Sequence, residues 1–467
     1  MNFGLIRKAA IAALGLILLS AVPATAQDGG ATDMSQAGGV TANADGRLEM
    51  DMGQAVAYAL GQNQTMESAK EQAMAAESGR KSSLGAFGPA LSTSYGFERN
   101  QPVQRFMGME QDANLYTWTV SVNQAIFTGF RLLSEYQKAA LQRDYYYSSQ
   151  FQTELDLITT VQENFLNLLK ARENVNSAED SLTRLKDQLR VTTAFYEVGL
   201  RPRLDVLQAE VDAANAEDML LQAQNTLSTQ QARMNTLLNL PVEAPITYVG
   251  GLDYIPFDST LEQCLTTAYR LRPDVDMASQ SVEMAKQDRR IAASGFYPQI
   301  NGYFNTQTQG DTLRAAGSDN MRTGYHQWNI GVLANWSLFE WGQTFYSVQQ
   351  AAHLVSSSQA DERALHEEVA YQVKSQLLKI SETRKRIKVA QYGLVQAKEA
   401  YRVALARYEA QVGTNTDLLD AQAKLSAAEA SLTEAQADYL ISLAVLYASM
   451  GVANPTLDVS LSPQTAQ

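Results

Sequence analysis

The segment that decides the fold is RYEAQVGTNTDLLDAQAKLSAAEASLTEAQADYL, residues 407–440. A second copy of its beginning, FYEVGLRPRLDVLQAE, occupies residues 195–210, and the tyrosines Tyr196 and Tyr408 of the two copies lie 212 positions apart. The same or nearly the same offset relates the pairs Phe87/Phe296, Pro89/Pro298, Asp205/Asp417, Ala216/Ala428, Leu220/Leu432 and Gln224/Gln436. Several motifs that return in one order indicate that the chain is a duplication.

Each half carries a hydrophobic heptad on a stretch that is poor in glycine and proline. The large residues of the heptad are Val161, Leu168, Val175, Leu182, Leu189 and Tyr196 in the first half, and Val373, Ile380, Ile387, Leu394, Tyr401 and Tyr408 in the second. Small residues commonly follow three positions later, as Ala171 and Ala397 do. Such a seam is typical of antiparallel helices that pack closely in a coiled coil. The alternative is the core stripe of an ordinary globular protein.

The lengths of the expected helices are also informative. Residues 131–196 and 343–410 would form helices of ~99 and ~102 Å at a rise of ~1.5 Å per residue. Residues 48–84 and 204–239 would each span roughly 55 Å, so that two such helices placed end to end match one long helix. We therefore expect a long tube of antiparallel helical hairpins, with the hairpin turns at the far end from the strands.

Two stretches of alternating apolar and polar residues predict strands. They are residues 116–122 and 328–338, and weaker candidates lie at 91–97 and 300–305. Period-two alternation with aromatic residues suits a membrane β-barrel, and it suits a half-buried sheet of a soluble protein equally well. Four strands cannot close a barrel alone, because the smallest membrane barrels have about eight. A barrel would therefore need strands from two or three chains.

The ends of the chain are expected to lie outside the fold. Residues 1–26 combine a basic start, an apolar run and the small-x-small sequence Ala24-Thr25-Ala26, which predicts an export signal. Its alternative is an uncleaved membrane anchor. The expected organisation is a signal peptide at 1–26, a flexible leader at 27–47, a first repeat at 48–240, an equatorial linker at 241–260, a second repeat at 261–454 and a flexible tail at 455–467.

Composition argues against several classes of protein. The 467 residues include 37 Lys and Arg against 50 Asp and Glu, an acidic balance that disfavours a nucleic-acid partner. A single cysteine and three histidines predict neither a disulfide framework nor a metal site. The sequence holds no GxxxxGK(S/T) phosphate loop and no constellation of catalytic residues, so we expect neither an enzyme nor a cofactor.

Two groups of polar residues are candidate sites. Asp205 and Asp417 follow tight turns and begin helices, so that helix N-capping is the simplest interpretation, and Asp420 lies one turn further on. The basic residues Lys379, Arg384, Lys385, Arg386 and Lys388 form a cluster on one expected helix. This cluster is interpreted either as a solvated helix face or as a docking surface for an acidic adaptor protein.

The duplicated segments and the Phe-x-Pro motifs before the strands resemble the TolC-like outer-membrane channel-tunnel family, the outer membrane efflux proteins. The resemblance covers residues 48–454. It implies a mainly helical homotrimer in which twelve strands form one barrel in the lipid of the cell outer membrane and the helices form an α-barrel tunnel in the periplasm. It also implies partners, namely a periplasmic adaptor protein and an inner-membrane ABC or proton-driven pump.

The resemblance assigns roles at the hairpin turns. Asp417 and Asp420 match the family's aspartate rings at the periplasmic entrance, and Asp205 and Tyr408 match residues that latch neighbouring helices closed. Asn415 stands where the namesake of the family has an arginine that helps to lock the closed state. The absence of a lipid-anchor cysteine after the export signal resembles the secretion-associated branch of the family.

We therefore expect a passive outer-membrane exit duct, for efflux of small molecules, for type I protein secretion or for both. One alternative is a periplasmic coiled-coil adaptor, which would have one hairpin and soluble β-domains. Another is a secreted enzyme, for which the sequence offers no catalytic residues. The sequence does not select the cargo, because a wide tunnel need not read its cargo through side chains.

Overall fold

A computed structural model describes residues 41–42, 48–99, 114–315 and 325–454. The expected signal peptide, most of the expected leader and the expected C-terminal tail lie outside the described residues. Two residues of the leader segment, Thr41–Ala42, form the short strand β1.

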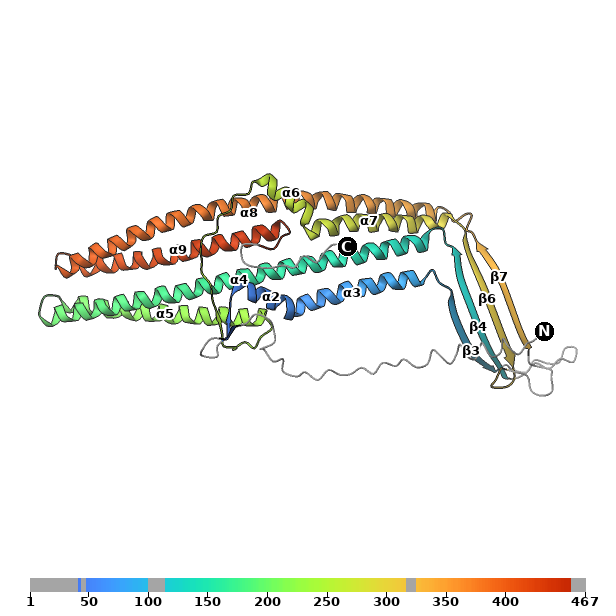
Figure 1. Cartoon of the computed structure of the whole chain (residues 1–467), viewed down its shortest axis with the longest axis horizontal. Helices are drawn as coiled ribbons and strands as arrows, with labels where there is room; N and C mark the ends of the chain where they lie inside the picture. Colours follow the sequence, from blue (N-terminus) through green and yellow to red (C-terminus); the bar gives the residue numbers. More distant parts are fainter. Residues whose placement is uncertain (1–40, 43–47, 100–113, 316–324, 455–467) are drawn as a thin grey trace. The chain divides into compact units, whose positions relative to one another are not determined.

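Two long helical hairpins dominate the fold (Figure 1). The first pairs α4, Arg131–Glu197, with α5, Arg203–Leu237, and the second pairs α8, Gln343–Glu409, with α9, Asn415–Ser449. Both long helices have 67 residues, which corresponds to ~100 Å of helix, and their bounds agree with the expected ranges to within one residue. The hairpins meet through α4 and α9, so α4 and α9 lie between α5 and α8.

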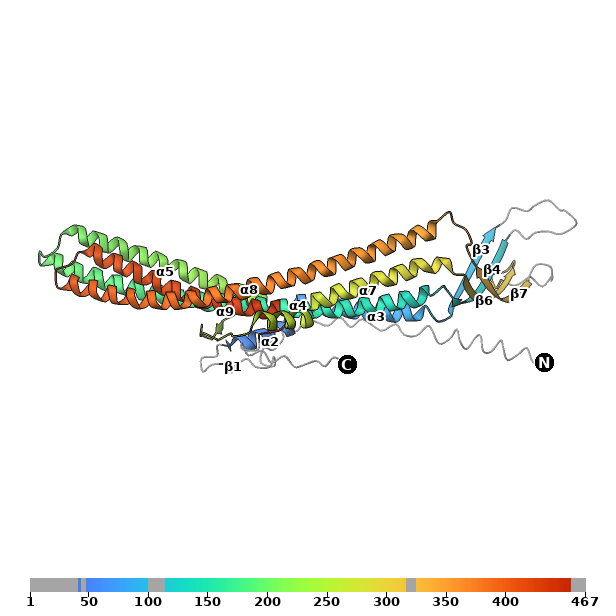
Figure 2. The ribbon, with the colours of Figure 1, turned by 90° about the horizontal axis from the view of Figure 1, so that it is seen from above.

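α5 and α9 pair with only part of α4 and α8, and shorter helices pack against the rest of these two long helices. α3, Gln64–Gly85, packs on α4, and α7, Pro273–Ala293, packs on both α4 and α8 (Figure 2). They are preceded by α2, Met52–Gln62, and α6, Leu261–Leu271. No helix in the described ranges is both long enough and apolar enough to cross a membrane.

The expectation of one helix over 48–84 was wrong, because the chain breaks at Asn63. This residue has an extended backbone, and its side chain accepts a hydrogen bond from the backbone N–H of Thr65, so it ends α2 and caps α3. The second half breaks at the equivalent place, where the residue before Pro273 is held extended.

A four-stranded antiparallel sheet lies at the end of α4 that is remote from the hairpin turn. Its order is β3, Ala90–Arg99, then β4, Asn114–Phe127, then β6, Gln299–Gly310, then β7, Tyr325–Asn335. The central pairing of β4 with β6 joins the two halves of the chain, with Val122 opposite Phe304. β7 ends before Trp336 and Leu338, which were expected to continue it. Among the described residues, β3 and β7 are each paired on one side only.

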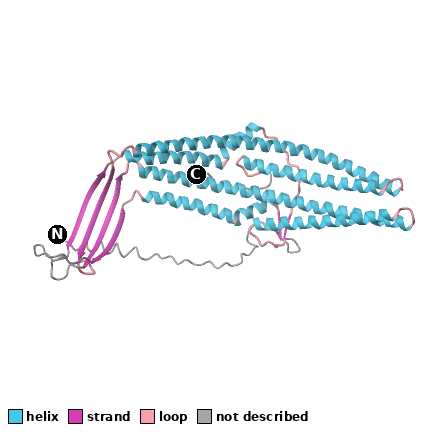
Figure 3. Ribbon diagram, turned by 180° about the vertical axis from the view of Figure 1, so that it is seen from behind, coloured by secondary structure: helices cyan, strands magenta, loops and turns pink. Residues whose placement is uncertain are grey.

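The linker between the halves is tied to the middle of the hairpins. Its strand β5, Ile246–Tyr248, pairs with β2, Leu48–Met50, in a second small sheet that also contains β1 (Figure 3). The Arg172 side chain of α4 donates hydrogen bonds to the carbonyls of Tyr248 and Gly250. The buried Tyr439 hydroxyl of α9 donates to the carbonyl of Ile255, 2.5 Å away. The linker is therefore hydrogen-bonded to both hairpins, through α4 of the first and α9 of the second.

Candidate functional site at the hairpin turns

The two hairpin turns are built by helix ends that use left-handed backbone conformations. α4 ends in a turn whose Gly199 has a φ of +75°, and its backbone N–H bonds to the carbonyl of Tyr196. α8 ends in a turn whose left-handed residue is Gln411, with a φ of +63°. A left-handed residue after the last helical turn is the usual way to end a helix, and it returns the chain sharply.

The start of α9 shows how Asp417 is held. Thr414 is the N-cap residue: its hydroxyl accepts from the backbone N–H of Asp417 at 3.1 Å, and the Asp417 carboxylate accepts from the backbone N–H of Thr414 at 3.2 Å. This capping box satisfies two backbone N–H groups that the helix itself leaves unpaired. The hydrogen bonds from Thr414, and more weakly the nearby Arg407, lower the pKa of Asp417.

The expectation that Asp205 and Asp417 are N-cap residues was therefore wrong in its register. Both lie in the first turn of their helices, and the N-cap positions belong to Pro202 and Thr414. The physical reason is that proline cannot donate a backbone hydrogen bond and suits the beginning of a helix, so Asp205 comes three residues after the N-cap, still in the first turn. There its carboxylate lies 3.9 Å from the guanidinium of Arg201.

Asp417 and Asp420 line a groove of about 500 Å³ between α8 and α9, together with Arg407, Gly413 and Lys424. Asp420 forms an ion pair with Lys424 at 2.6 Å, and both side chains are exposed. The aspartates of one chain thus share a groove, and basic groups partly neutralise them. Lys424 lies four residues after Asp420, a helical spacing that could have revealed this pair in the sequence.

Tyr408 is fully buried between the two hairpins. Its hydroxyl lies 2.8 Å from the hydroxyl of Thr192 on α4, and its ring lies 6.0 Å from the ring of Phe195. The guanidinium of Arg201 lies 4.8 Å from the ring centre of Tyr408 and donates a hydrogen bond to the carbonyl of Gly413 at 2.7 Å. The two residues expected to form the latch, Asp205 and Tyr408, are therefore joined through Arg201, which the sequence reasoning missed.

Asn415 extends the contact between the hairpins. It is buried, and its side-chain oxygen accepts from the side-chain amide of Gln188 on α4 at 2.9 Å. Its side-chain nitrogen has no hydrogen-bond partner among the described residues. We use the name tip latch for the set Gln188, Thr192, Arg201, Tyr408 and Asn415.

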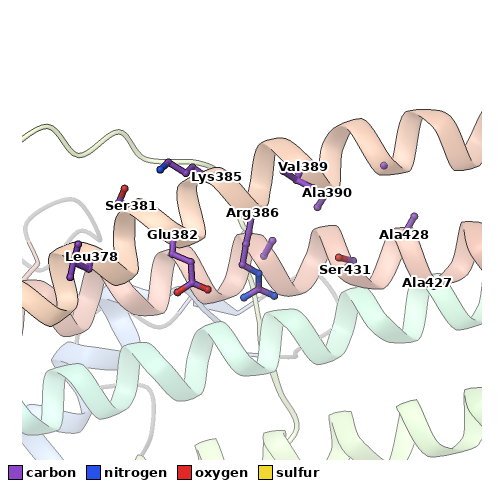
Figure 4. Close-up of a pocket in the computed structure, with 12 residues that line it drawn as sticks. Leu378, Ser381, Glu382, Lys385, Arg386, Val389, Ala390, Ala427, Ala428 and Ser431 are labelled. Carbon is purple, nitrogen blue, oxygen red and sulfur yellow. The ribbon is translucent and has the colours of Figure 1, made fainter.

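The basic cluster on α8 divides into two kinds of residue. Arg386 forms an ion pair with Asp438 of α9 at 2.9 Å, and Arg384 bonds to the carbonyl of Phe257 and lies 3.5 Å from Asp258. Figure 4 shows Arg386 reaching toward α9, whereas Lys385 points away from it. The arginines therefore hold the linker and α9, and Lys385 and Lys388 are exposed on the surface.

The described residues form two long helical hairpins and a four-stranded sheet whose outer strands are each paired on one side. Solved outer-membrane channel proteins share this fold. The family model "Outer membrane efflux protein" matches residues 55–240 and 265–452, and the chain belongs to this family. It is an outer-membrane exit duct of the kind used for efflux or type I secretion, with its helical part in the periplasm. This confirms the family and the location that the sequence resemblance implies. The family consists of channel proteins and not of enzymes.

Individual relatives agree with this assignment. The alkaline protease secretion protein AprF of Pseudomonas aeruginosa is 24% identical over 329 residues, which cover 68% of this chain and 66% of AprF. The outer membrane protein TolC of Vibrio cholerae is 22% identical over 400 residues, which cover 83% of this chain and 87% of TolC. The crystal structure of the outer membrane protein VceC of Vibrio cholerae superimposes with a TM-score of 0.74 at 17% identity, over 86% of this chain and 96% of VceC.

Proposed function

We propose that the chain is one third of a passive duct, in which three copies together supply twelve strands to one barrel. The observation that carries this proposal is the four-stranded sheet whose outer strands, β3 and β7, are each paired on one side only among the described residues. Unpaired strand edges are not tolerated in lipid, because each unsatisfied backbone group costs several kcal/mol there. Pairing β7 of one copy with β3 of the next would remove every edge.

The two repeats, 48–240 and 261–454, would then each contribute one hairpin to a tunnel of six hairpins, with the linker 241–260 around its middle. The turns of all six hairpins would converge at one opening. Asp417 and Asp420 would place six carboxylates there, enough to favour cations over anions in a narrow passage. The tip latch, with Asp205 beside it, would fix the two hairpins of each copy against each other.

The duct would depend on partners for energy and for contact with the inner membrane. We expect a periplasmic adaptor protein and an inner-membrane ABC or proton-driven pump, as the family resemblance implies. Lys385 and Lys388 support an adaptor contact, since they are exposed while the neighbouring arginines are engaged within the chain. An adaptor identity for the chain itself does not fit, because such a protein would have one hairpin and this chain has two.

The cargo class is tested most directly in a deletion strain of the source bacterium. Loss of a secreted protein from the medium would indicate type I secretion, and sensitivity to bile salts and dyes would indicate efflux of small molecules. Either phenotype, restored by the intact chain, supports the proposed duct. A strain that is normal in both assays, with correct outer-membrane location of the chain in the parent, would contradict it.

A further inference from the structure

The two long helices begin in the same unusual way, directly after two consecutive residues whose backbone is left-handed. Before α4 these residues are Gly129 and Phe130, with φ of +61° and +68°. Before α8 they are Trp341 and Gly342, with φ of +50° and +83°. The two pairs are counterparts, 212 positions apart in the duplication. The glycine and the aromatic residue have therefore exchanged positions between the halves.

A close contact explains the glycine of the first half. Gly129 is buried, and a β-carbon on it would lie 2.6 Å from the carbonyl oxygen of Ser294 and 2.8 Å from the β-carbon of Tyr297. No side chain fits in that space. The turn 294–297 joins α7 to β6, and it lies beside Gly129 because β4 and β6 are paired. We name the contact of residues 128–130 with the turn 294–297 the inner junction.

In the second half, the counterpart of Gly129 is Trp341, whose side chain is 89% exposed. Its ring lies beside the ring of Phe339, with ring centres 5.0 Å apart, and Phe339 is itself 73% exposed. A left-handed backbone is unfavourable for a bulky residue, whereas glycine adopts it freely. An exposed tryptophan in an unfavourable conformation indicates a packing contact that a single chain does not supply.

The duplication also identifies a surface that fits this tryptophan. The turn 85–88, which joins α3 to β3, is the counterpart of the turn 294–297 at an offset of 209 positions. In both turns the backbone N–H of the last residue donates to the carbonyl of the first, at 3.1 Å. In the turn 85–88, however, these two residues are the exposed glycines Gly85 and Gly88. Apart from its own helix backbone, a β-carbon on Gly85 would meet no atom within 4 Å, so the surface is open.

The sizes of the facing side chains are exchanged on both sides. At the inner junction, Gly129 faces Tyr297. The duplicated parts offer the reverse combination, Trp341 and Gly88. A large side chain opposite a small one fills the space between two elements in either arrangement. The two exchanges together indicate that Trp341 and the turn 85–88 are packing partners.

These partners cannot meet within one chain. Trp341 follows β7 and the turn 85–88 precedes β3, and these strands are the opposite edges of the sheet (Figure 1). The partners would meet where β7 of one copy pairs with β3 of the next, as β4 pairs with β6 inside the chain. A second copy of the chain is therefore the occupant that the duplication selects.

We propose that Trp341 of each copy inserts against Gly85 and Gly88 of the next copy and thereby fixes β7 beside β3. The contact would lie where the sheet meets the helices, so that it aligns strand pairing and helix packing together. This inference rests on the proposed function, because it requires several copies around one barrel. It deepens that function by naming the side chain and the surface that select the partner strand.

An exchange of side chains tests the contact. Trp341→Gly should lower the recovery of trimer from mild detergent about tenfold or more, because it leaves a tryptophan-sized space unfilled. Gly88→Tyr should also lower it about tenfold, because it occupies the space that Trp341 needs. The double variant recreates the combination of Gly129 with Tyr297 and should return the recovery to within about twofold of wild type. Size-exclusion chromatography with light scattering measures the trimer.

The same variants distinguish a second copy from lipid as the surroundings of Trp341. If Trp341 were a lipid anchor, Trp341→Gly would lower recovery, Gly88→Tyr would leave it unchanged and the double variant would not be rescued. That pattern, or wild-type recovery in both single variants, would overturn the inference. Rescue by the double variant also shows that neither substitution simply prevents folding.

A disulfide provides a readout that does not depend on loss of the trimer. The buried Cys264 is first replaced by alanine. Trp341→Cys with Gly88→Cys should then form linked dimers and trimers in the oxidising bacterial periplasm, seen on non-reducing gels, and Trp341→Cys alone should give single chains. A pair that never links, in a chain that purifies as a trimer, would overturn the inference and leave the proposed trimer standing. If the wild-type chain is not a trimer, the proposed function fails and this inference fails with it.

Discussion

Arg201, in the turn of the first hairpin, contacts the second hairpin: its guanidinium is 4.8 Å from the ring centre of Tyr408 and 2.7 Å from the carbonyl oxygen of Gly413. Its own hairpin supplies Asp205, whose carboxylate is 3.9 Å away. The sequence resemblance expected a latch of Asp205 and Tyr408 and left open how it works with Asn415 in place of an arginine. In this chain the first hairpin supplies an arginine to the tip, and Asn415 binds Gln188.

Arg201→Ala should loosen the tip. It removes a cation–π contact and a charge-assisted hydrogen bond, which together stabilise the latch by about 2 kcal/mol, or a factor of roughly 30 in its equilibrium. Backbone hydrogen exchange in both turns should accelerate by about that factor, and the ion current through the resting duct should rise. The exchange rate and the current of Arg201→Lys should lie between those of wild type and Arg201→Ala, because lysine keeps the charge but lacks the planar guanidinium group. If the alanine variant had the exchange rate and current of wild type, Arg201 would not stabilise the contact between the hairpins.

Asp417→Asn together with Asp420→Asn should weaken the cation preference of the duct. Six converging carboxylates would attract multivalent cations, so a trivalent cation added on the periplasmic side should block wild-type current in planar bilayers. The double variant should lose this block. Lys424→Gln should strengthen it instead, since it frees Asp420 from its ion pair at 2.6 Å.

Two controls separate a role in selectivity from a role in helix capping. Thr414→Ala removes the N-cap and should cost about 1 kcal/mol of stability without altering the block. Asp258→Asn with Glu262→Gln removes two charges near the linker and should leave the block unchanged. A double aspartate variant that is blocked like wild type would leave Asp417 and Asp420 as helix-end residues only.

Leu166→Ala and Leu378→Ala form a matched pair across the duplication. Leu166 is 0% exposed within one chain, so its truncation should lower the free energy of unfolding by about 2–5 kcal/mol. Leu378 is 57% exposed, and its truncation should change the stability of a single chain by less than about 0.5 kcal/mol while reducing recovery of the trimer. Thermal unfolding and size-exclusion chromatography measure the two effects. If both variants lost the same stability and the same recovery of trimer, the different roles expected for Leu166 and Leu378 would be contradicted.

Lys385→Glu with Lys388→Glu should weaken binding of the periplasmic adaptor at least several-fold and leave the fold unchanged, because both side chains are exposed. Arg386→Ala should instead destabilise the second hairpin, since it leaves Asp438 without its ion pair. Binding of the purified adaptor, measured at two salt concentrations, checks the first expectation, and thermal unfolding checks the second. Wild-type affinity in the lysine double variant would assign the cluster to a solvated helix face.

Local patterns predicted the long helices because their signal is strong and repeated. The stretches poor in glycine and proline, with the heptads from Val161 and Val373 inside them, predicted both long helices to within one residue. The alternation at 116–122 and 328–338 predicted two strands, and the second of them ends at Asn335. β6 was the weakest candidate, and it extends over Gln299–Gly310 because β4 and β7 pair with it on both sides. Such pairing is a tertiary effect that no local pattern contains.

The site was predicted less completely than the fold. Asp417 and Asp420 do share one groove, because their spacing of three places them on one helix face. The break at Asn63 carries no proline, and the polar links between the two hairpins join residues more than 200 positions apart. Arg201 looked like one more charged turn residue until the fold placed Tyr408 beside it.

The mass of the purified protein in a mild detergent, measured by light scattering with the detergent subtracted, tests the proposed trimer most directly. The open four-stranded sheet predicts a particle close to three times the mass of one chain, with four strands from each copy. A stable single chain that conducts ions in a lipid bilayer would contradict the proposed trimer, because the four strands of one copy would then have to line a pore alone.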